Sequence, residues 1–431
     1  MTSTPSPSSS ASPDRSKSHR PTKSKRGRRG RGKRNRSQAP FAVVEPVWQK
    51  IFPQLPLDIP RITLAAWLAN DERLGFKDPC WLALIAPSSS AKTVILSALA
   101  DATEAYPLDT LTAQTFHSGM PDSEGKPQGL LYRLGRTPKI VIKDLSAILS
   151  KQPNQRDEIM GQLRTIADGD FTRATGMGTD ESVARWKGRM TLAVGMTTAI
   201  DIYHALHNQL GERFLRLRFG IDEDDLVAVG LQALENERMN RKPQSALASV
   251  FKKALDYAGV RLSNRSLSAA MDARLANLVA FISKARTGVV RDAKGEVQLI
   301  PQAEGPGRLI KQLQALACAL AALRGTSEVT DKDYKLVERV AFSSIPEPRG
   351  EILWALYNIG ATRISEFKQN VKLSDPTIRR HLEDLELLGL AEVAKGYGSA
   401  GSRFSPSKLG LKYLKNAGSG NRPKSGQNPP A

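Results

Sequence analysis

The stretch WLALIAPSSSAKTVILSAL, Trp81 to Leu99, decides the fold expected for this chain. It opens with a continuous apolar run, as in a strand buried on both faces of a parallel sheet. A turn rich in Pro and Ser follows, and the pattern after Lys92 is typical of a helix. A strand, a tight loop and a helix in this order present backbone N–H groups at a helix mouth, where an anion is stabilised. The sequence therefore predicts a phosphate-binding loop.

This loop has the spacing of the motif G-x-x-x-x-G-K-[ST], but Ala86 and Ala91 replace both of its glycines. In the motif, the lysine neutralises phosphate charge and the following hydroxyl meets Mg²⁺, a role that falls to Thr93. If either glycine position needs a positive φ, an alanine there is strained by about 1 kcal/mol. The residues expected to surround the phosphates are Pro87, Ser88, Ser89, Ser90, Ala91, Lys92 and Thr93.

Two later apolar runs end in polar residues that a nucleotide site uses. PKIVIKDLSAIL (Pro138–Leu149) ends its strand at Asp144, where a carboxylate would complete the Mg²⁺ shell. GRMTLAVGMTTAID (Gly188–Asp201) ends at Thr197, whose hydroxyl would lie beside the γ-phosphate. Each residue also has a purely structural interpretation, since Asp144 could cap a helix and Thr197 could belong to a turn.

A further segment, GERFLRLRF (Gly211–Phe219), places Arg213, Arg216 and Arg218 near another strand. An arginine aimed at the nucleotide of a neighbouring subunit would stabilise charge in the transition state. The alternative for Arg213 is a surface ion pair.

Together these motifs resemble the AAA+ ATPases, in the branch of the minichromosome-maintenance-type helicases, over roughly residues 78–345. LRTIADGDFTRATG (Leu163–Gly176) resembles the segment that leads into the helix-2 hairpin insertion of that branch, which implies that Phe171 and Arg173 face a central channel. The strand WKGRM and Thr197 resemble the sensor-1 region, although asparagine is usual there.

The resemblance continues into the arginine-bearing segments. ERF (Glu212–Phe214) resembles the arginine-finger motif, which gives Arg213 a role in trans. Gly305–Ala341 resembles the lid helices, with Arg308 as the sensor-2 arginine that reports lid closure. The resemblance thus implies ATP and Mg²⁺ as cofactors, Lys92, Asp144 and Arg213 as catalytic residues, and a homo-oligomer, such as a ring, with ATP between subunits.

The chain departs from this family directly after Asp144. Leu145 stands where the family places a glutamate that orients the attacking water, and nothing positions Asp157 or Glu158 to replace it. ATP binding is therefore better supported than fast hydrolysis.

The residues after Pro348 have a different rhythm, which resembles a winged helix-turn-helix. EILWALYNIG and ISEFKQNV read as two helices, and Ser374 and Pro376 start a third. Within that helix an apolar face is predicted, formed by Ile378, Leu382, Leu385 and Leu388. The outward residues are then Thr377, Arg379, Arg380 and His381, with no catalytic role for His381. LAEVAKG and SRFSPS, on either side of a Gly-rich loop, are the expected strands of the wing.

Such a unit places its third helix in the major groove of DNA. Contacts to bases or phosphates are expected from Thr377, Arg379 and Arg380, and contacts to the backbone from Lys395 and Arg403 at the wing. The same kind of unit also serves as a protein-docking module. A basic hairpin at Arg286–Val297 faces either DNA or solvent.

Composition agrees with a polyanionic partner. The chain of 431 residues carries a net charge of +20, of which residues 1–40 supply +11. Its two cysteines predict neither a disulfide framework nor a zinc site, and no apolar run spans a membrane. A cytoplasmic, nucleoid-associated location is expected.

The predicted organisation is α/β, with a three-layer core, a mainly parallel sheet, a helical lid and a C-terminal winged helix. The segments are a disordered basic tail (1–40), a helical lead-in broken by prolines (41–77), the core (78–220), the lid (221–345), the winged helix (346–416) and a disordered tail (417–431). Two functions follow. One is an ATP-binding protein that acts on DNA as a helicase-like or loader-like replication factor. Whether it is also a DNA-stimulated ATPase is left open by the two missing glycines and by Leu145. The other is a DNA-binding regulator or initiator whose loop is inactive or only senses nucleotide.

Overall fold

The computed structural model describes residues 39–118, 122–124, 126–174, 183–202, 213–260, 262, 266–292, 294–299, 302–394 and 401–418. Of the two predicted tails, the structure describes only residues 39–40 and 417–418. Lys395 also lies outside the described residues. None of the helices in the described part of the chain is long and apolar enough to cross a membrane.

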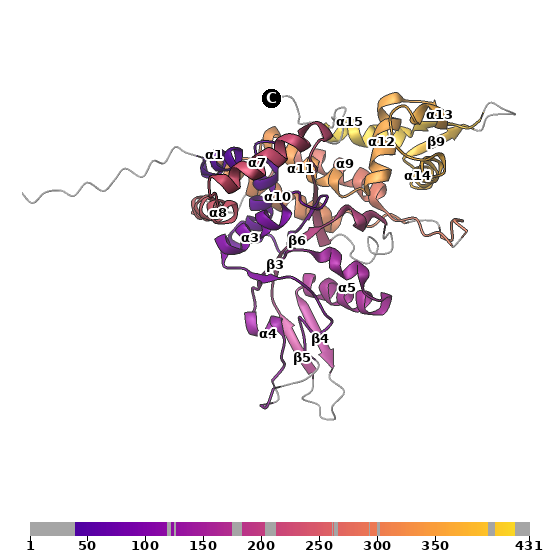
Figure 1. The fold of residues 1–431 in the computed structure, drawn as a ribbon. Helices are drawn as coiled ribbons and strands as arrows, with labels where there is room; N and C mark the ends of the chain where they lie inside the picture. The colour runs from indigo at the N-terminus through magenta and orange to yellow at the C-terminus, as the bar shows by residue number, and fades with distance from the viewer. Residues whose placement is uncertain are drawn as a thin grey trace, which may run out of the picture. The chain divides into compact units, whose positions relative to one another are not determined.

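The centre of the fold is a sheet of five parallel strands, in the order β2-β3-β6-β1-β7. Two of these strands, β3 and β6, are labelled in Figure 1. The strands are β1 (Trp81–Ile85), β2 (Tyr106–Leu108), β3 (Lys139–Ile142), β6 (Thr191–Met196) and β7 (Phe214–Arg218). The strand of the predicted loop pairs with β6 on one side and with β7 on the other. The α/β class and the parallel sheet are thereby confirmed.

Alternate residues of β1 enter two separate cores. Leu82 and Leu84 pack in one apolar cluster, whereas Trp81, Ala83 and Ile85 pack in the other. Every residue of β1 is buried, as expected for a strand covered on both faces. The helices α2 (Asp58–Leu68), α3 (Lys92–Thr103), α8 (Pro243–Gly259) and α10 (Gly307–Arg324) supply the first cluster, and α5 (Pro153–Ala167) and η3 (Leu145–Ser150) supply the second.

The lead-in contains η1 (Pro40–Val43), α1 (Glu45–Ile51), α2 and η2 (Glu72–Leu74). The prediction that Pro60 breaks this region is wrong, because Pro60 lies in the first turn of α2. The missing N–H of a proline costs little there, since the first N–H groups of a helix have no partner within the helix.

An antiparallel hairpin, β4 (Asp170–Ala174) with β5 (Val183–Lys187), follows α5. The expectation that Phe171 faces a channel is wrong, because Phe171 is buried in the second core and pairs across the hairpin with Trp186. Arg173 forms an ion pair with Glu158 over 3.4 Å. The WKGRM segment is not a strand of the central sheet, since its first two residues end β5.

The described residues within 223–343, the part of the chain predicted to be a lid, are largely helical. They form η6 (Glu223–Asp225), α7 (Leu226–Arg238), α8, α9 (Ala269–Arg286), α10 and α11 (Asp331–Ser343). In the basic segment after α9, Arg291 and Val297 form an antiparallel bridge, so a hairpin-like turn is present. The remaining short elements before the lid are α4 (Leu130–Leu134) and η4 (Thr198–Ile202).

The C-terminal module comprises α12 (Glu347–Ile359), β8 (Thr362–Arg363), α13 (Ile364–Phe367), α14 (Asp375–Leu387), β9 (Ala391–Ala394), β10 (Arg403–Pro406) and α15 (Lys408–Ala417). Its three strands form an antiparallel sheet in the order β8-β10-β9. The apolar face predicted for α14 is confirmed, since Ile378, Leu382 and Leu385 have no exposed surface and Leu388, just after the helix, is 4% exposed.

Candidate functional site

Three segments far apart in the sequence meet at the carboxyl edge of the sheet. Because β1, β3 and β6 are parallel neighbours or next neighbours, the residues that follow them lie along one edge. The loop Ala86–Thr93 follows β1, Asp144 follows β3, and Thr197 follows β6. The three polar positions picked from the sequence are therefore brought to the same edge.

The loop contains two residues in the left-handed region. Ser89 has φ +61° and Ala91 has φ +63°, whereas Ala86 is not among the residues with positive φ. Only the second of the two missing glycines therefore leaves a strained alanine, at a cost of about 1 kcal/mol. Ala91 is also the N-cap residue of α3 and offers no side chain to cap the helix. The first N–H groups of α3 thus remain available to an anion.

The side chain of Lys92 forms hydrogen bonds to the backbone of the loop. Its ammonium group donates to the carbonyl oxygens of Ala86 (2.7 Å) and Pro87 (2.5 Å), and the residue is 9% exposed. Burial lowers the pKa of Lys92, and the negative charge of Asp144 partly opposes that shift. Lys92 and Asp144 thus interact electrostatically at this edge of the sheet.

Asp144 and Thr197 are connected through Ser146. The backbone N–H of Ser146 donates to Oδ1 of Asp144 (2.8 Å), so Asp144 caps η3, as its structural interpretation required. The backbone N–H of Thr197 donates to Oγ of Ser146 (2.7 Å), and its hydroxyl lies 3.1 Å from the same atom. Sequence reasoning missed Ser146, although Asp-x-Ser after a strand is itself a capping signal.

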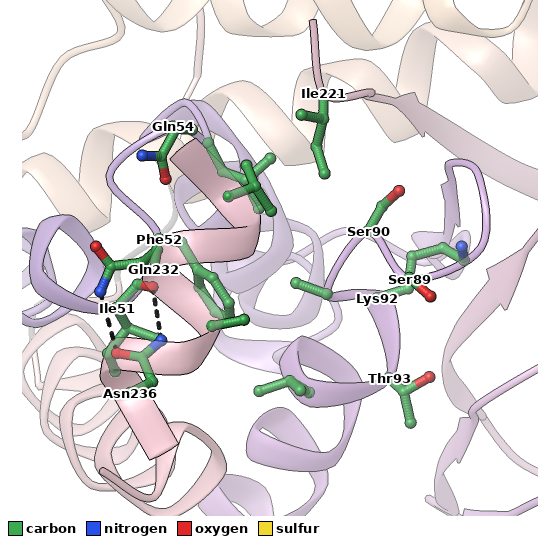
Figure 2. A pocket seen from close by; sticks show the side chains of 15 residues that line it. Ile51, Phe52, Gln54, Ser89, Ser90, Lys92, Thr93, Ile221, Gln232 and Asn236 are labelled. Atoms are coloured by element: carbon green, nitrogen blue, oxygen red, sulfur yellow. Dashed lines mark hydrogen bonds between the residues drawn. The ribbon is translucent and has the colours of Figure 1, made fainter. Parts of the chain in front are cut away.

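A cavity of about 320 Å³ opens beside the loop (Figure 2). Figure 2 shows the loop residues on one side of it, and Phe52, Gln232 and Asn236 on the other. The volume falls in the range of small-molecule sites, which are mostly apolar with a few placed polar groups. The side chains that line it come from three segments, and they are Ile51, Phe52, Gln54, Leu55, Ser89, Ser90, Ala91, Lys92, Thr93, Val94, Ile221, Val229, Gln232, Ala233 and Asn236.

Most of the wall opposite the loop was missed by sequence reasoning. The amide of Asn236 donates to the carbonyl of Ile51 over 3.2 Å, which ties α7 to the lead-in. No local sequence pattern predicts this contact, because the two residues are far apart in the chain.

The candidates for activating water are placed poorly for that task. Leu145 is 2% exposed and packs in the second core, so it offers no functional group at the edge. Glu158 is exposed on α5 and forms its ion pair with Arg173, and Asp157 is exposed on the same helix. Near the loop, the described residues thus provide a cation, Lys92, and a carboxylate, Asp144, but no evident general base.

Arg213 and Arg308 lie at the opposite, amino edge of the sheet. Arg213 directly precedes β7, and both arginines form ion pairs with Asp168, at 3.0 Å for Arg213 and 2.8 Å for Arg308. Helix α5 starts near the carboxyl end of β3 and runs back, so Asp168, which follows it, lies at the amino edge. Arg308, held by Asp168, therefore does not reach the loop of its own chain as a sensor-2 arginine would. Burial lowers the pKa of Arg213, and the neighbouring Arg308 adds to the shift.

The other arginines of β7 are engaged within the fold. Arg218 forms a bidentate ion pair with Asp201, at 2.6 and 2.7 Å, and Arg216 is buried against the carbonyl of Ser344. Burial lowers the pKa of Arg216 to about 10.

In the C-terminal module, Arg379, Arg380 and Arg403 are exposed and Thr377 is half-buried. The hydroxyls of Thr377 and Ser374 lie 2.8 Å apart at the start of α14. The prediction that His381 points outward is wrong, because His381 is 4% exposed beside Asp384.

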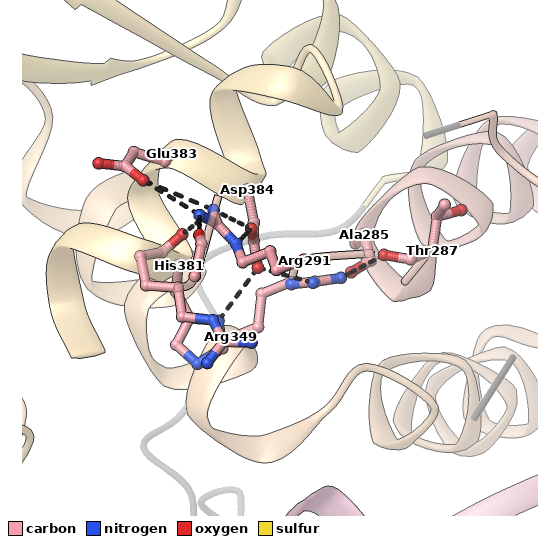
Figure 3. A network of polar contacts seen from close by, with 9 residues as sticks. Ala285, Thr287, Arg291, Arg349, His381, Glu383 and Asp384 are labelled. Atoms are coloured by element: carbon pink, nitrogen blue, oxygen red, sulfur yellow. Dashed lines mark hydrogen bonds and ion pairs between the residues drawn. The ribbon is translucent and has the colours of Figure 1, made fainter. Parts of the chain in front are cut away.

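A buried ionic cluster joins α14 to the lid (Figure 3). Asp384 accepts from Arg291 at 2.7 Å and from Arg349 at 3.0 Å, and all three residues are almost inaccessible to solvent. Arg349 also donates to the carbonyls of Ala285 and Thr287. The basic hairpin therefore faces neither DNA nor solvent at Arg291, which instead packs against α14.

This environment sets the charge of Asp384. Burial alone would raise its pKa, but His381 and the guanidinium groups of Arg349 and Arg291 hold the pKa of Asp384 well below its ordinary value of 3.8. The carboxylate thus stays ionised and fixes two buried cations.

No protein-family model matches this chain, and no curated protein is significantly similar to it. Among the described residues, no three side chains of His, Cys, Asp or Glu gather into a metal site. A Mg²⁺ ion held by Thr93 and Asp144 would therefore take its remaining ligands from phosphate and water, as Mg²⁺ commonly does.

Replacing Ala91 by glycine should leave the stability unchanged or raise it by up to about 0.5 kcal/mol, because the relief of about 1 kcal/mol of left-handed strain is offset by about 0.5–1 kcal/mol of extra chain entropy that glycine loses on folding. The matched control is Ala86→Gly, which has no strain to relieve and should destabilise by about 0.5–1 kcal/mol. Urea denaturation of both variants measures the difference. Equal loss of stability in the two variants would contradict the strain at Ala91.

Asp384→Asn should cost about 3–5 kcal/mol, because it leaves the charges of Arg291 and Arg349 buried without a counterion. Glu386→Gln, on the exposed side of the same helix, should change stability by less than about 0.5 kcal/mol. Because the pKa of Asp384 is lowered in the fold, its stabilisation is present above the ordinary value of 3.8 and is lost as the pH falls below it. Thermal unfolding should therefore show the gap between wild type and Asp384→Asn narrowing below that pH.

Proposed function

We propose that this protein binds ATP with Mg²⁺ at the loop Ala86–Thr93 and acts on DNA, as a helicase-like or loader-like factor of the AAA+ type. The observation that carries the proposal is the cavity of about 320 Å³ that joins the loop to an apolar wall. A triphosphate fits the loop end, where Lys92 supplies a positive charge, and a base fits the end near Phe52.

Each residue of the site has a defined task under this proposal. The N–H groups at the start of α3 hold phosphate oxygens, and Lys92 leaves the carbonyls of Ala86 and Pro87 to neutralise them. Thr93 and Asp144 would hold Mg²⁺, which polarises the phosphate when bound. Thr197, fixed by Ser146, faces the same edge as a polar sensor.

Arg213 and Arg308 support a homo-oligomer, in which they would serve a neighbouring subunit. Both lie at the amino edge, away from their own loop, and the lining of the cavity contains Lys92 as its one charged side chain among the described residues. A triphosphate carries several negative charges, so a second source of cations would complete the site. Arginines from the next copy in a ring would meet that need.

The C-terminal module supports DNA as the partner. Its order of helices and strands, with a three-stranded antiparallel sheet, is compatible with a winged helix-turn-helix whose recognition helix is α14. Arg379, Arg380 and Arg403 are exposed and free to meet phosphates or bases. A DNA partner implies a nucleoid-associated, cytoplasmic location.

A second function is favoured by Leu145 and Ala91. A buried leucine where a general base is needed, and a strained alanine in the loop, both suit a DNA-binding regulator or initiator that senses nucleotide without turning it over. ATP turnover separates the two proposals, because the first requires hydrolysis that rises with DNA, and the second requires nucleotide and DNA binding without hydrolysis.

Lys92→Ala should weaken ATP binding by at least about tenfold, because it removes the cation that meets the phosphates. Isothermal titration calorimetry with ATP and excess Mg²⁺ measures the effect, and a hydrolysis assay with and without DNA accompanies it. Lys143→Ala is the matched control, since Lys143 lies at the same edge, pairs with Asp109 and does not line the cavity. Wild-type protein that is folded and takes up no adenine nucleotide would refute the proposal.

Arg379→Ala and Arg380→Ala should each weaken DNA binding and reduce the slope of log affinity against log salt by about 1 for every phosphate contact that is lost. Lys412→Ala, an exposed cation on α15 of the same module, should leave both quantities unchanged. Fluorescence anisotropy with duplex and single-stranded DNA over a salt series measures them. Affinities that are equal in all three variants would show that α14 does not contact DNA.

A further inference from the structure

Helix α7 exposes a row of large apolar side chains, called here the apolar stripe. Val227 is 75% exposed, Leu231 63% and Leu234 50%. They are spaced by four and three residues, so they lie on one face of the helix. A contiguous apolar surface, unlike scattered single residues, marks a contact with another molecule.

The apolar stripe is the outer face of α7. At 100° per residue, Val229 and Asn236, which line the cavity beside the loop, lie on the opposite side of the helix from Leu231. The inner face is fixed to the protein, because the amide of Asn236 donates to the carbonyl of Ile51 over 3.2 Å. A partner on the outer face would therefore leave the wall of the cavity in place.

The two ends of the apolar stripe carry opposite charges. Asp222, Glu223 and Asp224 are exposed just before the helix. Arg238, the last residue of the helix, and Lys242 are exposed at its other end. No ion pair between described residues engages any of these five side chains. The outer face thus runs from an acidic end to a basic end.

Such a face is complementary to itself in the antiparallel orientation. Asp224 lies seven residues before Leu231 and Arg238 lies seven residues after it. A two-fold axis at Leu231 therefore brings Asp224 of each copy opposite Arg238 of the other. Gly230, beside this axis, is exposed and has open space around it, so it lets two helices approach closely. A parallel pairing would instead place the two acidic ends together.

We infer that the apolar stripe docks on the apolar stripe of a second copy of this chain, in an antiparallel, two-fold dimer. The contact uses the same surface on both copies, so it closes at two chains. DNA is a poor occupant, because the three carboxylates at the acidic end would face its phosphates. The inference goes beyond the proposed function and does not rest on it, since neither the loop nor the C-terminal module takes part.

The size of the contact predicts a reversible dimer. Helix α7 has 13 residues and is about 20 Å long, so the buried area lies at the small end of specific interfaces. Two chains of net charge +20 repel each other, but salt at about 0.1 M screens charges that are more than about 10 Å apart. The dimer should thus form in a concentration-dependent way at moderate salt.

The test uses full-length variants of each feature. Leu231→Ser with Leu234→Ser removes most of the apolar stripe. Asp224→Arg and Arg238→Asp each place like charges opposite one another, and the two together restore the complementarity. All four residues are exposed, so the fold is kept, which circular dichroism and thermal unfolding check. The controls on α15 are Leu411→Ser, at a leucine that is 47% exposed, and Lys412→Asp.

Sedimentation velocity without nucleotide or DNA, at up to about 100 µM protein, should show dimers of the wild type and of both controls. The double leucine variant should raise the dissociation constant at least about tenfold. Each single charge reversal should raise it about fivefold, because every reversal acts twice in a two-fold dimer. The combined reversal, and an equimolar mixture of the two single reversals, should dimerise about as well as the wild type.

Three results would overturn the inference: a wild type that stays monomeric, a double leucine variant that dimerises as the wild type does, or a combined reversal no better than either single one. Calorimetry with ATP on the double leucine variant reports nucleotide binding separately. Loss of the dimer with intact ATP uptake concerns the apolar stripe alone, whereas a folded wild type that dimerises without ATP uptake contradicts only the proposed function.

Discussion

The parallel pairing of β1 with β6 and β7 is the constraint on which the rest of the structure depends. It fixes the carboxyl ends of β1, β3 and β6 at one edge and the residues before β7 at the other. The loop with Lys92 can therefore meet Asp144 and Thr197, while Arg213 is kept about one strand length away. A one-strand change in sheet order would separate the loop from its carboxylate, with no change in any local motif.

Much of this edge could be predicted from the sequence, because its signals are local. The apolar runs before Asp144 and Thr197 predict strands, and the structure has β3 and β6 there, with each polar residue just after its strand. The wall of the cavity could not be predicted, since it arises where α7 packs near the lead-in and Asn236 reaches the carbonyl of Ile51. Phe171 and His381 were misplaced for a related reason: hairpin pairing and a buried ion cluster decided their burial, and helical or strand periodicity shows neither.

The charge of the chain also has to be read through its contacts. A net charge of +20 favours a polyanion, yet several arginines serve the fold itself. Asp384 neutralises Arg291 and Arg349, and Asp168 holds Arg213 and Arg308 together. The cations that remain exposed on α14 and at the start of β10 are therefore more informative about the proposed DNA partner than the total charge is. The buried cluster has a further effect, because it links α14 to the segment that follows α9 and so fixes how α14 packs against that segment.

The two departures of the loop from the phosphate-binding motif bear on different steps of the proposed function. The left-handed φ of Ala91 shows that the loop keeps the backbone path for which glycine is usual, so the alanine costs stability without removing the N–H groups that would meet phosphate. Leu145, in contrast, is buried and removes a functional group from the edge. Binding depends on backbone geometry and Lys92, both of which are retained, whereas hydrolysis depends on orienting a water molecule. Under the proposed function, a site that preserves the first set of features and lacks the second is better suited to sensing nucleotide than to fast hydrolysis, and a fast motor would need a neighbouring copy to supply the missing group.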